Sequence, residues 1–266
     1  MADLELERHE RGIAVLRLNR PARLNALTDD AVADFTRILE QLATDTALRV
    51  LVLTGAGRGF CAGFDLTLAA HAPLTDELGE IGAWTARQEA FAGVVTRLRA
   101  LRAPVIAAVN GPANGAGLGL ALACDIRMAA PSAAFNAAFV KVGMSSCDIG
   151  VSWLLPRCIG MSRAFEIMLT GRMVSATEAE RIGLVSSLAP SDAELLPLAL
   201  ATARSIAANS AMGVWMTKRG AWANVEAGSL QAAIELENRT QILVRGTGEL
   251  ARAATALTAR KRPGAS

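Results

Sequence analysis

The sequence predicts an α/β protein with one mixed core and a helical C-terminal region. Continuous apolar runs, typical of strands buried on both faces, alternate with segments whose apolar residues recur at helical spacing. Two glycine-rich loops each follow such a strand and precede a helix. The last part of the chain has helical periodicity alone and is rich in alanine. We therefore expect a core over residues 1–200 and a helical region over residues 201–266.

Length, charge and composition restrict the class of protein. A chain of 266 residues is long enough to bury a core of its own. Lys and Arg total 27 against 25 Asp and Glu, and basic residues gather densely only in the tail Arg260-Lys261-Arg262, so no nucleic-acid partner is expected. The four cysteines form no Cys-x-x-Cys pair, and the two histidines stand at no metal spacing. We expect no metal, no disulfide framework and no Ser-His-Asp triad.

The stretch from Ala103 to Ala123 is the most apolar of the chain and raises the question of a membrane span. Its prolines, asparagines and glycines would leave backbone groups unsatisfied in lipid, so no span is expected. The first residues lack a basic region followed by an apolar run, which is the pattern of a signal peptide. The expected location is therefore the cytoplasm.

The elements expected before the second glycine-rich loop follow from local patterns. Thr28 is a suitable N-cap for the first long helix, and Asp65 for a short helix beginning at Leu66. Residues 71–82 have no clear periodicity and are expected to be mobile. The expected elements are strands 4–7 and 13–18 as a hairpin, a helix from Thr28 to about Thr44, strand 50–54, a helix from Trp84 to Leu101, and strand 104–109.

Helices dominate the expectations for the second half. A helix over 118–123 opens from the second loop, and strand 125–129 follows it. Short strands are expected at 173–174 and 184–187. The helices expected after Asp148 are 150–159, 162–169, 176–182, 191–208, 211–223, 228–245 and 247–261.

The two glycine-rich loops are candidates for binding negative charge. A helix that starts just after such a loop directs its free N–H groups and the positive end of its dipole outward. Gly55-Ala56-Gly57-Arg58-Gly59 and Gly115-Ala116-Gly117-Leu118-Gly119 both begin like a dinucleotide-binding fingerprint, but the third glycine comes one residue early in each. A nucleotide-binding oxidoreductase is therefore disfavoured, while simple tight turns stay an alternative.

Five segments, in order, resemble the crotonase (enoyl-CoA hydratase/isomerase) superfamily over nearly the whole chain. They are Arg20-Pro21-Ala22-Arg23-Leu24-Asn25-Ala26-Leu27, Gly59-Phe60-Cys61-Ala62-Gly63-Phe64-Asp65-Leu66, Ala107 through Gly117, Cys124-Asp125-Ile126-Arg127-Met128-Ala129 and Gly150-Val151-Ser152-Trp153-Leu154-Leu155-Pro156-Arg157. The resemblance implies a spiral of ββα units whose C-terminal helices, residues 201–266, assemble a homotrimer or hexamer. It also implies an acyl-CoA thioester as substrate in fatty acid metabolism, with no separate cofactor.

The resemblance assigns binding roles to both loops. It implies an oxyanion hole for the thioester oxygen made by the backbone N–H groups of Phe64 and Ala116. It places CoA along Ala22, Arg23, Leu24, Ala62, Asp65 and Leu66. Arg23 could pair with a CoA phosphate or be a solvated surface residue. Asp65 is favoured as a helix cap over an acid or base.

The chain departs from the family at the acids. Hydratases of this family flank a water with two glutamates, whose positions fall here on Gly119 and Phe139, so hydration by the two-acid route is not expected. Asp148 is the remaining carboxylate, in a stretch where isomerising and dehalogenating relatives place a working aspartate. It could transfer a proton, cap the helix beginning near Ile149, or do both. Cys147 is expected to be a small buried residue and not a nucleophile.

The sequence therefore predicts an enoyl-CoA hydratase/isomerase family enzyme, a lyase or isomerase that stabilises a thioester enolate and transfers protons by Asp148. The alternative is an acyl-CoA-binding homologue that has lost catalysis, since both hydratase glutamates are replaced.

Overall fold

The structure, a computed structural model, describes residues 2–260. It separates into two compact units, the first ending at Ser205 and the second beginning at Ile206. This division lies close to the boundary expected at residue 200. The role in assembly that was expected for residues 201–266 stays a prediction.

A six-stranded sheet forms the centre of the first unit. Its strand order is β1-β2-β3-β4-β6-β9, with β1 antiparallel to β2 and the other neighbours parallel. Every residue of β3 and β4 is buried, as the continuous apolar runs predicted. The strands are β1 Leu4–Arg8, β2 Ile13–Leu18, β3 Val50–Gly55, β4 Val105–Val109, β6 Ile126–Ala129 and β9 Ser187–Leu188.

A second sheet has three short strands, β5 Pro112–Asn114, β7 Ala134–Asn136 and β8 Val174–Ser175. β5 and β7 were not predicted, because three residues are too few to establish a period of two. The chain passes from β4 to β5, then through α3 (Ala116–Ala123) to β6 and β7, and so visits the two sheets in turn. This alternation gives the spiral of ββα units that the resemblance implied.

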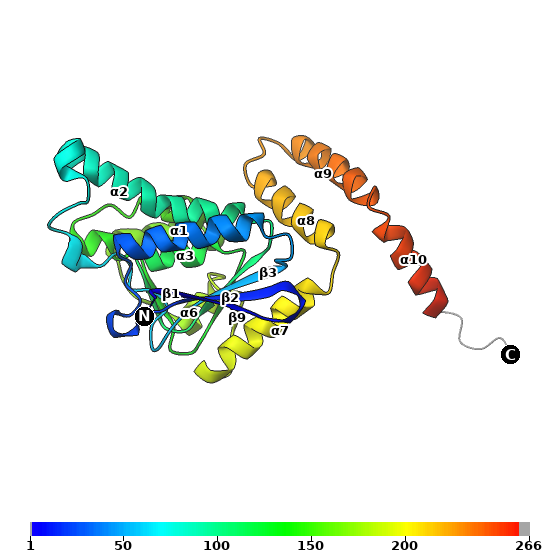
Figure 1. The fold of residues 1–266 in the computed structure, drawn as a ribbon, viewed down its shortest axis with the longest axis horizontal. Helices are drawn as coiled ribbons and strands as arrows, with labels where there is room; N and C mark the ends of the chain where they lie inside the picture. Colours follow the sequence, from blue (N-terminus) through cyan, green and yellow to red (C-terminus); the bar gives the residue numbers. More distant parts are fainter. Residues whose placement is uncertain (1, 261–266) are drawn as a thin grey trace. The chain divides into compact units, whose positions relative to one another are not determined.

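Three helices lie together on one face of the six-stranded sheet: α1 Asp29–Thr44, α2 Thr75–Ala100 and α3 (Figure 1). The predicted cap of α1 is confirmed, since the Thr28 side chain accepts a hydrogen bond from the Ala31 N–H. The predicted start of this helix at Trp84 was wrong, because α2 already begins at Thr75 and continues past a break at Gly79; the mobility expected for residues 71–82 stays a prediction. Most of this first part is exposed on all sides and therefore has no apolar stripe.

The remaining helices match their predicted ranges to within a few residues. Those after α3 are α4 Val151–Ile159, α5 Met161–Thr170, α6 Ala176–Arg181, α7 Leu195–Ala207, α8 Ala211–Asn224, α9 Leu230–Arg245 and α10 Glu249–Arg260. Residue 261, the predicted end of the last helix, lies outside the described residues. Across the described part of the chain, no helix has the length and apolar character of a membrane span.

The second unit exposes apolar side chains. α8 and α9 pack against each other, and the Asn224 amide donates to Glu237 at 3.0 Å. α9 has no buried residue and leaves Leu230, Ile242 and Leu243 exposed. Large apolar side chains exposed along one helix are typical of a surface that another protein covers.

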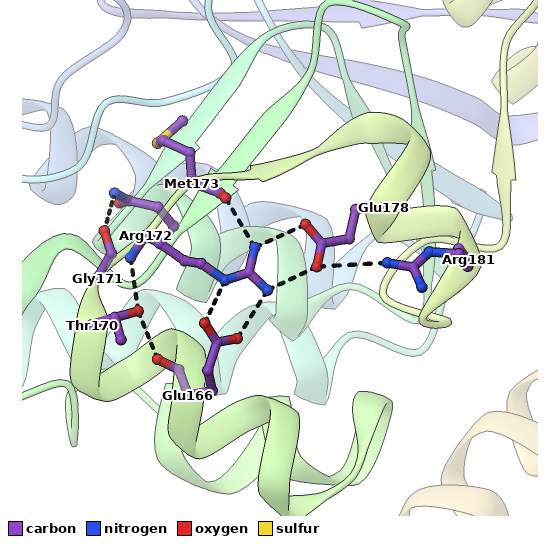
Figure 2. A network of polar contacts seen from close by, with 8 residues as sticks. Glu166, Thr170, Gly171, Arg172, Met173, Glu178 and Arg181 are labelled. Carbon is purple, nitrogen blue, oxygen red and sulfur yellow. Dashed lines mark hydrogen bonds and ion pairs between the residues drawn. The ribbon is translucent and has the colours of Figure 1, made fainter.

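An ionic network joins α5 and α6 on the surface of the first unit (Figure 2). The Arg172 guanidinium donates to both oxygens of Glu166 and to both oxygens of Glu178, over 2.6–2.9 Å. Bidentate pairs of this kind are the strong form of surface ion pair. These hydrogen bonds hold the pKa of both glutamates below its ordinary value of 4.5.

Arg172→Gln is expected to destabilise the protein at neutral pH and to have little effect in acid. Because the glutamate pKa values are lowered by folding, the pairs stabilise the native state above about pH 4.5 and lose their effect as pH falls through the lowered values. Urea unfolding of both proteins between pH 7 and pH 3 measures this convergence. Arg97→Gln, which breaks the single exposed pair with Glu40, is the matched control and should change stability less. A difference that persists unchanged at pH 3 would contradict the prediction.

Candidate active site

Two asparagines hold the first glycine-rich loop against the sheet. The buried Asn25 amide donates to the carbonyls of Ala56 and Gly59, at 3.0 and 2.7 Å. Asn110, at the end of β4, accepts from the Gly55 N–H at 2.9 Å and donates to the Gly57 and Gly59 carbonyls. Since amide side chains satisfy the turning backbone, the loop is fixed without regular secondary structure.

The second loop lies directly against the first. The Asn114 N–H donates to the Cys61 carbonyl at 3.0 Å, and Cys61 forms an isolated bridge with Ala113. A Cβ atom on Gly63 would stand 2.8 Å from the Asn114 carbonyl oxygen and 3.4 Å from the Ala116 nitrogen. Only glycine allows this approach, so the residue before Phe64 touches the start of α3.

The N–H groups of Phe64 and Ala116 have no hydrogen-bond acceptor among the described residues. The bridge between Leu27 and Phe64 uses the N–H groups of Leu27 and Asp65 instead. Ala116 is the first residue of α3, where an N–H has no partner within the helix. The two loops thus present two unused donors on adjacent segments.

Both donors belong to residues that line a cavity of about 900 Å³ in the first unit. Its wall also includes three segments that were predicted separately: α2, the region around Phe139, and the stretch that contains Asp148. The structure thus brings together six of the predicted site residues, namely Ala62, Phe64, Leu66, Ala116, Phe139 and Asp148. A cavity with this size and few polar groups is typical of a small-molecule site.

Asp148 is half-buried and is held through one oxygen. Its Oδ1 accepts from the Ile149 N–H at 2.7 Å and from the amide nitrogen of Gln88 on α2. Within the described residues, Oδ2 has no hydrogen-bond donor. Desolvation raises the pKa of Asp148, and the two hydrogen bonds oppose this only in part.

Of the two roles considered for Asp148, capping of the helix near Ile149 was wrong. α4 begins at Val151 with Gly150 as N-cap, and no side chain accepts a hydrogen bond at that end. The Asp148 carboxylate turns instead to α2 and the cavity. Capping of the short helix by Asp65 is confirmed, since its side chain accepts from the Thr67 N–H and hydroxyl at 3.2 and 2.7 Å.

Gly119 does not line the cavity, although Phe139 does. The Ile149 side chain covers Gly119, so that a Cβ atom there would stand 2.4 Å from the Ile149 Cδ1. Ile149 has a φ of 34°, which is unusual for a β-branched residue. The space in which the first hydratase glutamate would begin is therefore filled by an apolar side chain.

The residues that the resemblance assigned to CoA divide into three groups. Ala62 and Leu66 line the cavity, and Leu24 is adjacent because its carbonyl accepts from the Ala62 N–H at 2.9 Å. Ala22 and Arg23 are exposed and do not line it. Asp65 is buried and paired with Arg20 at 3.2 Å; hydrogen bonds from Thr67 and Arg20 lower its pKa.

The sequence did not reveal Arg87 and Gln88, which both line the cavity from α2. Arg87 is buried, donates to both oxygens of Asp29 at 2.8 and 2.5 Å, and lies 5.3 and 4.8 Å from the ring centres of Phe64 and Trp84. It stands four residues before Phe91, on the buried face of the helix. The signal available in the sequence was a charged residue at helical spacing from the apolar residues of α2, which indicates a buried and therefore paired charge.

The cysteine prediction was wrong at one position. Cys147 is exposed and lines the cavity. Cys61 is buried, and burial raises the pKa of its thiol to about 12, so that it stays protonated and unreactive.

Comparisons with known proteins agree with this arrangement. The family model described as Enoyl-CoA hydratase/isomerase matches residues 8–256. A protein of Mycobacterium tuberculosis named probable enoyl-CoA hydratase EchA12 is 48% identical, over 88% of this chain and 81% of its own length.

Two solved structures have the same fold. A probable enoyl-CoA hydratase/isomerase from Mycobacterium abscessus is 40% identical with a TM-score of 0.90, over 99% of this chain and 98% of that one. A monofunctional enoyl CoA isomerase from M. smegmatis is 43% identical with a TM-score of 0.74, over 87% of this chain and 98% of that one. The mixed α/β spiral expected from the sequence is therefore confirmed.

Proposed function

Because the chain belongs to the enoyl-CoA hydratase/isomerase family, we propose that it isomerises an enoyl-CoA by moving a proton with Asp148. The observation that carries this proposal is the position of Asp148 in the same cavity as the two unused N–H donors, with one oxygen held and the other free. A structure similar to this chain at 43% identity is named an isomerase, which supports the same reaction class.

The two donors would act on the thioester oxygen. When Asp148 takes a proton from the carbon next to the thioester carbonyl of a 3-enoyl-CoA, the electrons of that C–H bond form a new C=C bond and those of the C=O bond move to oxygen. The N–H groups of Phe64 and Ala116 would stabilise the resulting negative oxygen. In related acyl chemistry one such donor contributes about 3 to 4 kcal/mol to the transition state.

Asp148 would then return the proton at a different carbon, which shifts the double bond without net gain or loss of atoms. Its free Oδ2 is the oxygen available for the proton, since Oδ1 already accepts two hydrogen bonds. Because its pKa is raised, Asp148 holds the proton during the intermediate more readily than an exposed aspartate would. Water addition needs a second acid, and Gly119 and Phe139 supply none.

Asp148→Asn is expected to lower the rate of double-bond migration at least about 100-fold, because a positioned proton-transfer group contributes about 10² to 10⁴. The measurement is the rate at which purified protein interconverts a 3-enoyl-CoA and its 2-enoyl isomer, together with deuterium uptake from D2O. Asp76→Asn, an exposed change in the first turn of α2, is the control and should leave the rate unchanged. Equal rates for the wild type and Asp148→Asn would overturn the proposal.

An acyl-CoA-binding protein without turnover is the second candidate, because both glutamate positions of the hydratases are replaced. Binding of acyl-CoA with no deuterium uptake from any enoyl-CoA would favour it over the isomerase.

Assembly is part of the proposal. The exposed apolar residues of α9 support association of the second unit with further copies of the chain, as a trimer or hexamer. The cytoplasmic location stays a prediction.

A further inference from the structure

We propose that the cavity selects an acyl group that is apolar along its length and uncharged at its far end, and that it rejects acyl groups ending in a carboxylate. This inference rests on the proposed function, because it names the substrate class of the same site. It is carried by the apolar rim of the cavity, by its three carboxylates, and by the occupied state of its one guanidinium.

Large apolar side chains are left exposed around the cavity. Leu66, Ile81, Val142 and Met144 all line it and are exposed by 58%, 84%, 51% and 62%. They come from three parts of the chain, around residues 66, 81 and 142–144, and all line this cavity. A gathering of exposed apolar residues on one site is typical of a surface that an apolar ligand covers. An apolar acyl chain would remove these side chains from water.

The interior of the cavity continues the apolar surface. Phe64 and Phe91 meet edge to face with ring centres 5.6 Å apart, and Trp84 and Phe139 also line the wall. A carboxylate carried into these surroundings would lose its water and would need a cation or several donors to replace it.

Arg87 is not available as that cation. It is the one Lys, Arg or His that lines the cavity within the described residues. Its Nε and Nη2 donate to Asp29, and its Nη1 donates to the Leu68 carbonyl at 3.1 Å. Three of the five N–H groups of this buried guanidinium are used, and its charge is already paired with Asp29, so it has little left for a ligand.

The ionisable groups facing the cavity would repel a second carboxylate. Glu80 and Glu89 on α2 line it together with Asp148, which is hydrogen-bonded to the same helix, and among the described lining residues no cation is free to balance them. Cys147 is the other titratable lining group. Like charges near a surface interact weakly in water, but their repulsion adds to the loss of hydration.

Binding of two saturated acyl-CoA compounds of equal length tests the inference, because neither can react. Calorimetry would compare octanoyl-CoA with its counterpart that carries a carboxylate in place of the terminal methyl group. We expect octanoyl-CoA to bind at least about 30-fold more tightly, since an unpaired polar group costs roughly 2 kcal/mol or more on burial. Equal affinities, or tighter binding of the carboxylated compound, would overturn the inference.

Two variants assign the selection to the named carboxylates. Glu80→Gln with Glu89→Gln should tighten binding of the carboxylated compound about 3- to 10-fold more than binding of octanoyl-CoA at low salt. Glu77→Gln, an exposed change on α2 outside the cavity wall, should alter neither affinity. If the double variant tightens both compounds equally, the acidic groups act on CoA itself and this assignment is wrong.

The same measurements separate this inference from the proposed function. A clear preference for octanoyl-CoA without any double-bond migration would remove the isomerase proposal and keep the selection. Isomerisation of methyl-ended and carboxylated substrates with equal kcat/KM would do the reverse. Failure of both compounds to bind would overturn both.

Discussion

Gly117→Ala is expected to destabilise the first unit by more than about 3 kcal/mol and to abolish acyl-CoA turnover. A Cβ atom on Gly117 would stand 2.0 Å from the Cys61 carbonyl oxygen and 2.9 Å from the Cys61 carbonyl carbon. Both neighbours are backbone, so no side-chain rotation can relieve the contact. Overpacking at a site that cannot adjust is among the few single changes with effects of this size.

The loss would reach the candidate active site because Cys61 cannot move alone. Its carbonyl accepts from the Asn114 N–H, and its own N–H donates to Pro112 at 3.1 Å. Any displacement would therefore separate the segment before Phe64 from the start of α3, and with it the two unused N–H donors. The site and the stability of the unit depend on the same close approach.

Urea unfolding and turnover by the variant measure both effects. Gly220→Ala in α8 is the matched control, because nothing lies within 4 Å of its Cβ position; it should stabilise the second unit by about 0.5 to 1 kcal/mol. If Gly117→Ala unfolds within 0.5 kcal/mol of the wild type, the packing of the two loops is looser than described here.

The sequence predicted those parts of the fold that depend on one segment at a time. Buried strands such as β3 are continuous apolar runs, and Thr28 lies directly before a helical pattern. β5 and β7 are too short for a period to appear. They form strands because they pair with each other in the folded chain, a contact that the sequence alone does not indicate. The first part of α2 has no apolar stripe at helical spacing, so only the structure identifies it as a helix.

The candidate site divides in the same way. Glycines identified the loops, and the resemblance identified Phe64, Ala116 and Asp148. The partners of Asp148 were not predictable, because Gln88 lies 60 residues away on a helix surface. The sequence also did not indicate that Ile149 would cover Gly119. That contact depends on how the loop before α4 packs against α3 in the folded protein.

Gly119→Glu is expected to destabilise the protein by about 4 kcal/mol and to give no hydration of crotonyl-CoA. The new Cβ atom would stand 2.4 Å from Cδ1 and 2.7 Å from Cγ1 of Ile149, and the carboxylate would be enclosed by a fully buried helix. Restoring the acid alone would therefore not restore the two-acid arrangement. Stability from urea unfolding and crotonyl-CoA hydration by absorbance measure the two outcomes.

Ile149→Ala in the same chain should recover much of this loss, because it removes both of the closest atoms and opens a path from residue 119 to the cavity. Alone it should cost about 1 to 2 kcal/mol, since lost burial is partly offset by relief of an unusual φ for a β-branched residue. The double-mutant cycle should show a coupling of more than 1 kcal/mol. Additive effects would contradict the assignment of the clash to Ile149. With residue 119 acidic and its path open, a second carboxylate would join Asp148 near the proposed proton transfer. Detectable hydration only in the double variant would identify the Gly119–Ile149 contact as the feature that favours proton transfer over water addition.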